Sequence, residues 1–364
     1  MSEHNPQSIL ITGGAGFIGS NFVHHWVKLH PHCNVLVLDA LTYAGNLNNI
    51  SGLIERHKIK FVHANINEQA HVESLLKDNQ IDTIVHFAAE SHVDRSIDTP
   101  DEFIQTNVVG TLSLLKAAKH VWLDASPTKT KHRFHHVSTD EVYGSLSPNE
   151  PAFTEQHQYQ PNSPYAASKA ASDHLVRSYH ETYGLNTTIS NCSNNYGPYH
   201  FPEKLIPLVI TNILHNKPIP VYGDGQQVRD WLYVDEHCSA IDRIVRQAPA
   251  GEIYNVGGNN EQTNIDIVNL ICKMMNNKFA VDPTLANKFA PADFAIKGTS
   301  EQLITFVEDR LGHDRRYAIN ADKIKNTLGF APQKHFELLL ENTIDWYLDN
   351  KNWWEKLLHT GSLI

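Results

Sequence analysis

The chain has 364 residues, a length that suggests two or three domains, and its composition is that of an ordinary globular protein. Its formal net charge of -10 argues against binding to nucleic acid, which needs a basic surface. No apolar run approaches the roughly 18 residues of a membrane-spanning helix, and the polar start, Met1 to Ser8, is unlike a signal peptide. We therefore expect a cytoplasmic protein with no nucleic-acid or membrane partner.

The cysteines and histidines do not predict a metal site. The four cysteines lie far apart, show neither metal nor redox spacing, and are expected to be reduced and mostly buried. Although the chain has 23 histidines, the adjacent pair His135 and His136 would point to different faces of a strand. The H-E-x-x-H motif of zinc enzymes does not occur.

In the first half of the chain, short apolar runs alternate with amphipathic stretches. Five runs predict strands, at residues 8–12, 34–39, 60–64, 83–87 and 133–138. Helical patterns lie between several of them, most clearly from about Phe103 to Val121. This alternation implies a parallel sheet covered by helices on both faces. The predicted fold class is therefore α/β, with a Rossmann-type doubly wound parallel sheet.

Beyond about Asn191, prolines and glycines cluster and the pattern loosens. We expect residues 1–193 to form the Rossmann domain, with segments around 234–262 returning to it. Residues 194–364 would form mainly a smaller α/β C-terminal substrate-binding domain. The segments 219–222 and 252–256 are expected to be strands.

Two later segments have weaker signals. The stretch from Asn276 to Glu301 has little periodicity, which predicts a surface excursion. The stretch from Phe336 to Leu358 predicts one amphipathic helix, whose Trp353 and Trp354 are expected to pack rather than to bind a ligand.

Glycines follow the first strand at a spacing typical of dinucleotide binding. Gly13, Gly16 and Gly19 have the spacing G-x-x-G-x-x-G and open a helix, whose free N–H groups and dipole favour a pyrophosphate. Asp39 ends the second strand, 20 residues after Gly19, where its carboxylate would bind ribose hydroxyls. The same carboxylate would repel a 2′-phosphate, so NAD is favoured over NADP.

Tyr165 and Lys169 are four residues apart in a helical pattern and therefore share one face. An ammonium group beside a phenol stabilises the phenolate, so we expect a lowered pKa for Tyr165. Near a nicotinamide, this phenolate can take a proton from a sugar hydroxyl while a hydride leaves the carbon. An exposed Tyr–Lys pair is common by chance, but the glycine loop upstream favours the catalytic interpretation.

The glycine spacing and the Tyr-x-x-x-Lys motif resemble the extended short-chain dehydrogenase/reductase family, also described as NAD-dependent epimerases and dehydratases. That family adds a Ser or Thr to the Tyr–Lys pair, and Thr139, after the fifth strand, occupies this place. Asp140 and Glu141 follow directly. In most proteins two such carboxylates are solvated turn residues. A dehydrogenase or 4-epimerase needs neither, so an acid and a base beside the hydride site suggest elimination of water.

Segments 88–96, 138–144, 194–205 and 229–234 resemble the dTDP-glucose 4,6-dehydratases, and the match covers nearly the whole chain. The resemblance implies that Tyr165 deprotonates the glucose 4-hydroxyl while hydride passes from C4 to NAD. Glu141 then removes the C5 proton, protonated Asp140 donates to the departing C6 hydroxyl, and the hydride returns to C6. The acid and base roles come from the family alone. The family also implies a resident NAD and a homodimer formed through helices on the Rossmann face.

The resemblance further implies the residues that contact each ligand. Those for NAD are Gly13, Gly16, Phe17, Ile18, Gly19, Asp39, Leu41, Thr42, Asn65, Ile66, Ala88, Ala89, Ser91, Thr106, Tyr165, Lys169 and Asn195. Those for the nucleotide sugar are Ser91, His92, Thr139, Asn194, Lys204, Leu205, Pro220, Tyr222, Arg229, Asn264, Arg310, His313 and Tyr317. Of these, Arg229 and Arg310 would approach the diphosphate, because a guanidinium pairs well with phosphate oxygens.

The chain departs from its relatives in places, and its motifs are also compatible with other functions. Asn65 stands where many relatives have Asp, and Leu311 where many have Pro. The alternatives are a nucleotide-sugar 4-epimerase, a GDP-mannose dehydratase and a non-catalytic NAD-binding module. The adjacent Asp140 and Glu141 argue against the epimerase, and the match near the C-terminus argues less strongly against the GDP-mannose enzyme. The complete set of proposed catalytic residues argues against the module. The deoxysugar pathway served is not predicted.

Overall fold

A computed structural model describes residues 3–125, 131–333 and 335–360, so Met1 and Ser2 of the predicted polar start lie outside the described residues. Its centre is a seven-stranded sheet in which each pair of neighbours runs parallel. In spatial order the strands are β10 (Ile253–Val256), β6 (Thr187–Cys192), β5 (Arg133–Thr139), β4 (Thr83–His86), β1 (Ser8–Thr12), β2 (Asn34–Asp39) and β3 (Lys60–His63). The order reverses between β1 and β4, as in doubly wound sheets that bind ligands at this point. The predicted fold class is confirmed.

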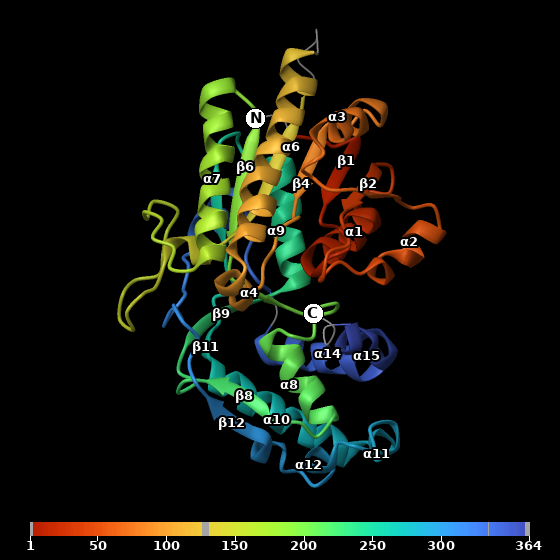
Figure 1. Cartoon of the computed structure of the whole chain (residues 1–364), viewed down its shortest axis with the longest axis vertical. Helices are drawn as coiled ribbons and strands as arrows, with labels where there is room; N and C mark the ends of the chain where they lie inside the picture. The colour runs from red at the N-terminus through yellow and green to blue at the C-terminus, as the bar shows by residue number, and fades with distance from the viewer. Residues whose placement is uncertain (1–2, 126–130, 334, 361–364) are drawn as a thin grey trace.

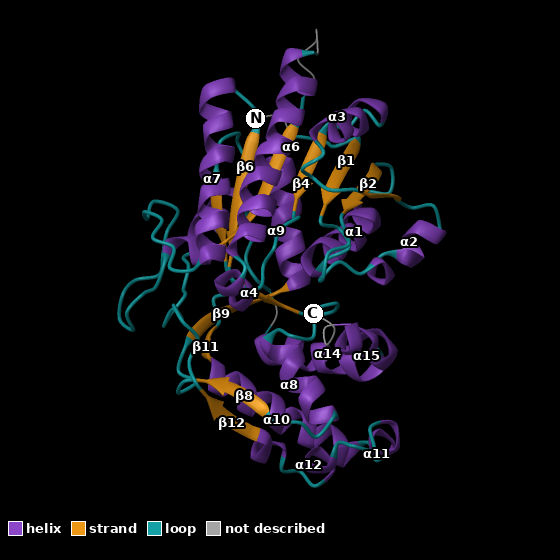
Figure 2. Ribbon diagram, viewed as in Figure 1, coloured by secondary structure: helices purple, strands orange, loops and turns teal. Residues whose placement is uncertain are grey.

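Helices cover both faces of this sheet (Figure 2). One face packs against α3 (Gln69–Asp78), α6 (Thr111–Lys119) and α7 (Pro164–Tyr183) through buried side chains such as Leu76, Leu114 and Val176. The other face packs against α1 (Phe17–Leu29), α2 (Ser51–Glu55) and α9 (Val234–Gln247). Because side chains alternate along a strand, Leu10 of β1 faces the first group, while Ile9 and Ile11 face the second.

The predicted helix from Phe103 to Val121 forms, but it is not a plain α-helix. It runs through α5 (Pro100–Phe103), the π-helical η2 (Ile104–Gly110), α6 and the π-helical η3 (His120–Asp124). Before it lies the short α4 (Val93–Asp98). In η2, Asn107 donates to Ser168 of α7 at 2.8 Å, which joins the two helices beside the site described below.

The second half of the chain builds a smaller body below the sheet in Figure 1. It contains the three-stranded sheet β11 (Glu261–Thr263), β9 (Val228–Tyr233) and β7 (Asn194–Tyr196), and the parallel pair β12 (Ile304–Val307) and β8 (Ile219–Tyr222). Its helices are α8 (Leu205–Leu214), α10 (Asn264–Val281), α11 (Thr284–Lys288), α12 (Asp293–Ile296), α14 (Phe336–Asp349) and α15 (Lys351–Thr360). Short 3-10 turns occur in both halves of the chain. The first half has η1 (Leu47–Asn49) and η4 (Asp140–Tyr143), and the second half has η5 (Ser300–Leu303).

The chain crosses between the two bodies. Strand β10 lies beside β6 in the large sheet, and α9 and α13 (Asp322–Leu328) pack near it. The predicted return of segments near 234–262 thus has a structural counterpart, while the domain limits at residues 193 and 194 stay a prediction.

Two predictions for the second half are wrong. Residues 276–301 are not a surface excursion, because Leu285, Phe289, Ala292 and Ala295 are buried in the core of the smaller body. The predicted helix from Phe336 to Leu358 is two helices, α14 and α15, which are separated at Asn350. Their aromatic residues pack as expected, since Trp354 is fully buried and its indole N–H donates to the carbonyl of Tyr347.

Candidate active site

The glycine-rich loop joins β1 to α1 and approaches other backbone too closely for a side chain. Gly13 has a φ of +69°, and a Cβ there would lie 2.5 Å from the backbone nitrogen of Ala88. A Cβ on Gly19 would lie 2.1 Å from the carbonyl oxygen of Gly13. Helix α1 begins after Gly16 with no side-chain cap and no acidic residue in its first turn. Its N-terminal N–H groups and dipole are therefore arranged to favour an anion.

Asp39 ends β2 beside this loop and holds it in place. Its carboxylate accepts from the N–H of Ala15 at 2.9 Å and from the N–H of Leu41 at 2.8 Å. Burial raises the pKa of Asp39, while these two hydrogen bonds act in the opposite direction. Asp39 thus has a structural contact with the glycine loop that the sequence did not predict.

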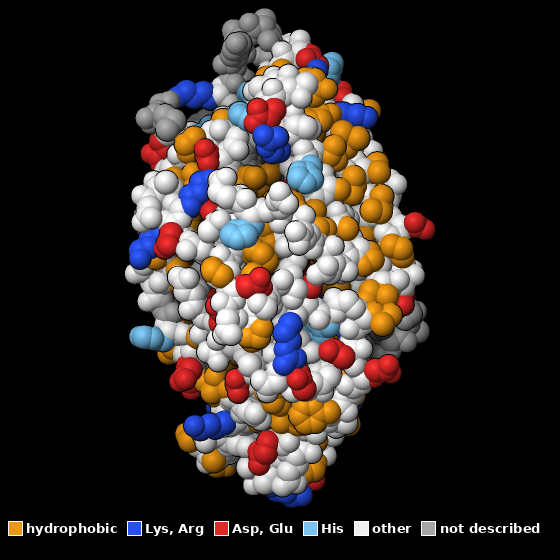
Figure 3. All heavy atoms as spheres, turned by 90° about the vertical axis from the view of Figure 1, so that its left-hand side faces the viewer, with side chains coloured by type: hydrophobic (Ala, Val, Ile, Leu, Met, Phe, Trp, Pro, Cys, Tyr) orange, Lys and Arg blue, Asp and Glu red, His pale blue; other side chains and the backbone are white. Residues whose placement is uncertain are grey.

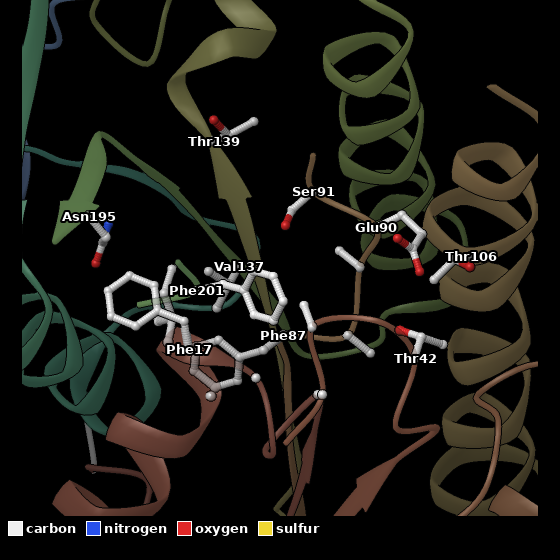
Figure 4. A pocket seen from close by; sticks show the side chains of 18 of the residues that line it. Phe17, Thr42, Phe87, Glu90, Ser91, Thr106, Val137, Thr139, Asn195 and Phe201 are labelled. Atoms are coloured by element: carbon white, nitrogen blue, oxygen red, sulfur yellow. The ribbon is translucent and has the colours of Figure 1, made fainter. Parts of the chain in front are cut away.

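A cavity of about 350 Å³ extends from the glycine loop past the carboxyl ends of the strands. Figure 4 shows Phe17 and Phe201 on one side of it and Thr42, Glu90 and Thr106 on the other. Most residues predicted to contact NAD line this cavity: Gly13, Gly16, Phe17, Ile18, Gly19, Asp39, Thr42, Asn65, Ile66, Ala88, Ala89, Ser91, Thr106, Tyr165, Lys169 and Asn195. Leu41 does not line it and contributes its N–H to Asp39 instead.

Helix α7 brings Tyr165 and Lys169 to the cavity. The helix starts there because Ser163 caps it, accepting from the N–H of Ala166 at 3.1 Å, and because Pro164 fits the first helical position. Lys169 is buried and donates to the carbonyl of Val137 at 2.8 Å. Burial lowers the pKa of Lys169 to about 8, against the effect of Asp173.

The expected lowering of the Tyr165 pKa is wrong for this structure. Burial, followed by the charge of Glu141, raises the pKa of Tyr165 well above its usual value, and hydrogen bonding with Thr139 only partly opposes this. The ammonium of Lys169 donates to the carbonyl of Val137 at 2.8 Å. Spacing along a helix predicts a shared face, but it does not predict how strongly that face is desolvated.

Thr139, Asp140 and Glu141 lie at the carboxyl end of β5 and line the same cavity as Tyr165. Thr139 is the last residue of the strand, and its hydroxyl accepts from the N–H of Glu141 at 3.3 Å, which starts the 3-10 turn. The two carboxyl groups differ in their surroundings. Burial, Glu141 and Asp230 raise the pKa of Asp140 well above its usual range, and one of its oxygens has no hydrogen-bond partner among the described residues.

Glu141 faces positive charge instead. Burial raises its pKa, but Arg310, Arg229 and Lys204 all act to lower it. The pKa of Asp140 is therefore raised further than that of Glu141, so the surroundings favour the proton more strongly on Asp140 than on Glu141. The structure thereby gives a physical reason, independent of the family, for an acid and a base at adjacent positions.

The predicted sugar-nucleotide residues divide into two groups. Ser91, Thr139, Asn194, Lys204 and Leu205 line the cavity. The others lie outside its lining: His92, Pro220, Tyr222, Arg229, Asn264, Arg310, His313 and Tyr317.

Several members of the second group nevertheless meet one another. Arg229 lies over the ring of Tyr317 at 4.2 Å and donates to the carbonyl of Asp314 at 2.9 Å. Arg310 pairs with Asp94 at 3.3 Å, and the hydroxyl of Tyr222 reaches the same carboxylate at 3.5 Å. Asp94 belongs to α4, so it joins the larger body to the smaller one.

Sequence reasoning missed several residues of the cavity wall. They include Tyr43, Phe87, Glu90, Val137, Cys192, His200, Phe201 and Glu203. Phe201 and Glu203 stand inside a segment that had been matched to relatives, so their place in that segment was an available signal. Glu90 likewise stands inside the matched segment 88–96, whereas Tyr43 belongs to no matched segment and only folding brings it to the wall.

The departures from the relatives have modest structural effects. Asn65 lines the cavity, and its side-chain oxygen accepts from the N–H of Asn67 at 3.0 Å. Leu311 is 76% exposed. In residues 3–125, 131–333 and 335–360, no helix is long and apolar enough to cross a membrane, and no group of three or more His, Cys, Asp or Glu could hold a metal ion.

Comparisons with known proteins agree with this geometry. A family model described as GDP-mannose 4,6 dehydratase matches residues 10–343. The dTDP-glucose 4,6-dehydratase of Escherichia coli is 50% identical over 96% of this chain and 96% of its own length. That of Xanthomonas campestris pv. campestris is 52% identical over 96% of this chain and 95% of its own. Among solved structures, the Streptomyces venezuelae enzyme DesIV, a dTDP-glucose 4,6-dehydratase with NAD bound, aligns with a TM-score of 0.84 at 42% identity, covering 96% of this chain and 99% of that one. The chain belongs to the GDP-mannose 4,6 dehydratase family of NAD-dependent epimerases and dehydratases.

Proposed function

We propose that this protein is an NAD-dependent dTDP-glucose 4,6-dehydratase, which converts dTDP-glucose into dTDP-4-keto-6-deoxyglucose and water. The observation that carries the proposal is the place of Asp140 and Glu141. They lie at the end of β5 and line one cavity together with Tyr165 and the glycine-rich loop. An oxidation needs only the tyrosine and the cofactor, whereas removal of water also needs an acid and a base.

The residues of the loop fit a dinucleotide. Gly13 lets the loop pack against the backbone of Ala88, where a Cβ would not fit, and the first turn of α1 offers N–H groups without a side-chain cap. We propose that these N–H groups hold the pyrophosphate and that Asp39 holds a ribose. NAD, when bound, supplies reversible oxidation at a carbon atom of the sugar.

The protein side chains move the protons. Tyr165 accepts the proton of the sugar 4-hydroxyl in its phenolate form, and Lys169 with Thr139 orients the reacting groups. Burial opposes this phenolate in the present structure, and the positive charge of a bound nicotinamide would favour it. The 4-ketone that results acidifies the proton on C5, and Glu141 removes it. Asp140 gives its proton to the hydroxyl leaving C6, which departs as water. The cycle would close when the hydride returns from the reduced cofactor to C6 and Glu141 returns the proton to C5. The electrostatic difference between the two carboxyl groups supports this assignment of acid and base.

The diphosphate requires positive charge from a chain of net charge -10. Arg229, Arg310 and Lys204 all act on Glu141, so three cations lie near one edge of the site. We propose that they also receive the diphosphate, with Arg310 exchanging its present contact to Asp94 for phosphate oxygens.

The experiment is to incubate the purified protein separately with dTDP-glucose, GDP-mannose and UDP-glucose. The expected result is loss of one water from dTDP-glucose, seen by mass spectrometry, with much slower reaction of the other two. Inversion at C4 without loss of mass would favour the 4-epimerase alternative. Faster dehydration of GDP-mannose would reassign the substrate, and no reaction with any of the three would overturn the proposal.

We further propose a homodimer in the cytoplasm. Helices α6 and α7 pack against each other on one face of the large sheet, and η2 beside them exposes Ile104 and Val109. Figure 3 shows hydrophobic side chains gathered along one edge of the molecule. Apolar side chains exposed on neighbouring helices support an isologous contact between two copies. A solution mass of twice 41.1 kDa is the expected result, and a mass of 41.1 kDa at working concentration would exclude the dimer.

A further inference from the structure

The loop Gly197–Lys204, here named the strap, joins β7 to α8 and lies against the glycine-rich loop. The ring of His200 stacks on Phe17, the first residue of α1, with centroids 4.2 Å apart and planes 17° apart. Phe201 meets Tyr43 edge-on at 5.7 Å. His200 and Phe201 of the strap, and Phe17 and Tyr43 opposite, all line the cavity. These aromatic contacts connect the strap to the opposite wall of the cavity beside the glycine-rich loop.

The strap is held from behind by the C-terminal helices. Tyr199 has a left-handed backbone, with a φ of +66°, and does not line the cavity. Its ring packs edge-on against Trp346 at 5.0 Å and Trp353 at 5.8 Å. The hydroxyl of Tyr347 donates to the carbonyl of His200. Residues more than 140 positions apart therefore determine where the strap lies.

Trp353 also reaches the glycine-rich loop, through one intermediate. Its indole N–H donates to the side-chain oxygen of Asn49 at 2.8 Å. The amide N–H of Asn49 in turn donates to the carbonyl of Ala15, between Gly13 and Gly16, at 2.9 Å. The N–H of Asn46 donates to the same carbonyl at 3.0 Å. Asn49 is 3% exposed, so loss of either bond would leave a polar group without a partner in a buried place.

We propose that Trp353 and Asn49 are positioning residues that keep NAD on the enzyme between turnovers. Trp353 contacts the strap through Tyr199 and donates to the side chain of Asn49, which in turn supports the glycine-rich loop. His24 of α1 contacts the same two residues, since its ring stacks on Tyr199 at 5.9 Å and its Nε2 lies 2.8 Å from the carbonyl oxygen of Asn49. Together Trp353 and Asn49 hold the strap and the glycine-rich loop, which form two walls of the proposed dinucleotide site, and we call this arrangement the clamp. The inference rests on the proposed function, in that a dehydratase of this kind returns the electrons it borrows and has no need to exchange its cofactor.

The test measures the rate at which NAD leaves the purified holoprotein, by exchange against isotopically labelled NAD. We expect Trp353→Phe, which keeps an aromatic ring but removes the N–H, to release NAD at least tenfold faster. Asn49→Asp keeps the acceptor for Trp353 but loses the donor to Ala15, and it should give a similar increase. The double variant should release NAD no faster than the faster single variant, because both act through one link.

The matched control is Trp354→Phe. This neighbouring indole points into the core of the smaller body and bonds to the carbonyl of Tyr347, so its loss should lower the thermal midpoint but leave the release rate within twofold of wild type. An unchanged release rate in both Trp353→Phe and Asn49→Asp would overturn the inference, as would equal acceleration by Trp354→Phe. If one of the two test variants fails to fold, the other decides.

The outcome is separable from that of the proposed function. A wild-type protein that holds NAD and yet does not dehydrate dTDP-glucose would refute the function, while the release rates still decide the clamp. A wild-type protein that binds no NAD would overturn both.

Discussion

The hydroxyl of Thr139 lies 3.4 Å from one carboxyl oxygen of Asp140, whose other oxygen has no partner among the described residues. One oxygen is thereby held in place while the other stays available toward the cavity that Asp140 lines. Because burial and neighbouring negative charge raise the pKa of this carboxyl group, the arrangement suits a proton donor rather than a ligand for a cation.

Substitution should therefore distinguish the acid role of Asp140 from the base role of Glu141. The double variant Asp140→Asn with Glu141→Gln should keep its NAD but lose dehydration by roughly 10²–10⁴-fold or more, since both the acid and the base are gone. In heavy water, Asp140→Asn alone should still exchange the C5 hydrogen of the substrate, and Glu141→Gln should not. Exchange that survives in Glu141→Gln would contradict the base assignment, and normal turnover of the double variant would refute the mechanism.

Loss of the phenol should stop the reaction at its first step. Tyr165→Phe removes the only atom that the side chain uses, and kcat should fall by roughly 10²–10⁴-fold while NAD stays bound. Tyr183→Phe is the matched control, because Tyr183 ends the same helix and is 48% exposed. Steady-state kinetics on both variants, with NAD content measured by absorbance, checks the prediction. Comparable rates for the two variants would remove Tyr165 from the mechanism.

Two glycines with similar backbone angles should respond very differently to alanine. Gly13→Ala places a Cβ 2.5 Å from the backbone of Ala88, so NAD binding or folding should be lost. Gly184→Ala, at the C-cap of α7, has a φ of +71° but nothing within 4 Å of the new Cβ, and should cost only about 1 kcal/mol. Thermal unfolding and NAD titration of the two variants test this, and a fully functional Gly13→Ala would show that the loop can move.

Asp39 should matter for the shape of the loop as well as for the ribose. Asp39→Ala leaves the N–H groups of Ala15 and Leu41 without acceptors, and NAD affinity should fall at least tenfold. Asp39→Asn retains one acceptor oxygen and should lose less. Calorimetric titration with NAD gives both numbers, with the exposed Asp78→Ala as the control. Unchanged affinity in Asp39→Ala would reject this residue as part of the NAD site.

Buried histidines should make the protein sensitive to acid. Burial lowers the pKa of His200 and His237 to about 3 and holds those of His86, His135 and His136 well below 6.5. A histidine whose folded pKa is depressed contributes stability above its unfolded pKa, and this stability is lost as the pH falls below that value. One pH unit below 6.5 costs roughly 1.4 kcal/mol for each group. Buried carboxyl groups such as Asp173, with a pKa raised to about 6, act in the opposite direction.

We therefore expect the thermal midpoint to drop steeply between about pH 7 and 5.5. The free energies lost at several buried histidines together approach the total stability of a protein. His237→Gln should lower the number of protons taken up on unfolding by about one, so its thermal midpoint should fall less steeply with decreasing pH. A slope identical to that of wild type would mean that His237 takes up its proton in the folded state.

The sequence predicted the elements that repeat a simple pattern and missed those that depend on distant contacts. The strands of the large sheet are continuous apolar runs such as Ile9 to Ile11, and parallel sheets buried on both faces require this pattern. The π-helical turn at Ile104–Gly110 and the break at Asn350 have no comparable local signal. The prediction of a surface excursion at residues 276–301 is wrong because Leu285, Phe289 and Ala292 lie in or beside short helices. Such helices have too few turns to show a helical periodicity of apolar residues.

The site shows the same division. The glycine spacing, Thr139 and the pair Tyr165 and Lys169 follow from motifs and meet at one cavity. The pKa of Tyr165 did not follow, because it depends on burial and on Glu141, which only the folded chain brings near. Nor did the sequence predict that the guanidinium of Arg229 would donate to the carbonyls of Val228 and Asp314.

Strand β10 comes from the second half of the chain, yet it forms the edge of the sheet that the first half begins. During synthesis on the ribosome, β6 has no partner strand on its outer edge until β10, which ends at Val256, has emerged. An exposed strand edge is a template for pairing with other chains. A nascent or truncated form that ends before β10 should therefore need a chaperone or aggregate, and no single cut of the chain can release the two bodies as independent folding units.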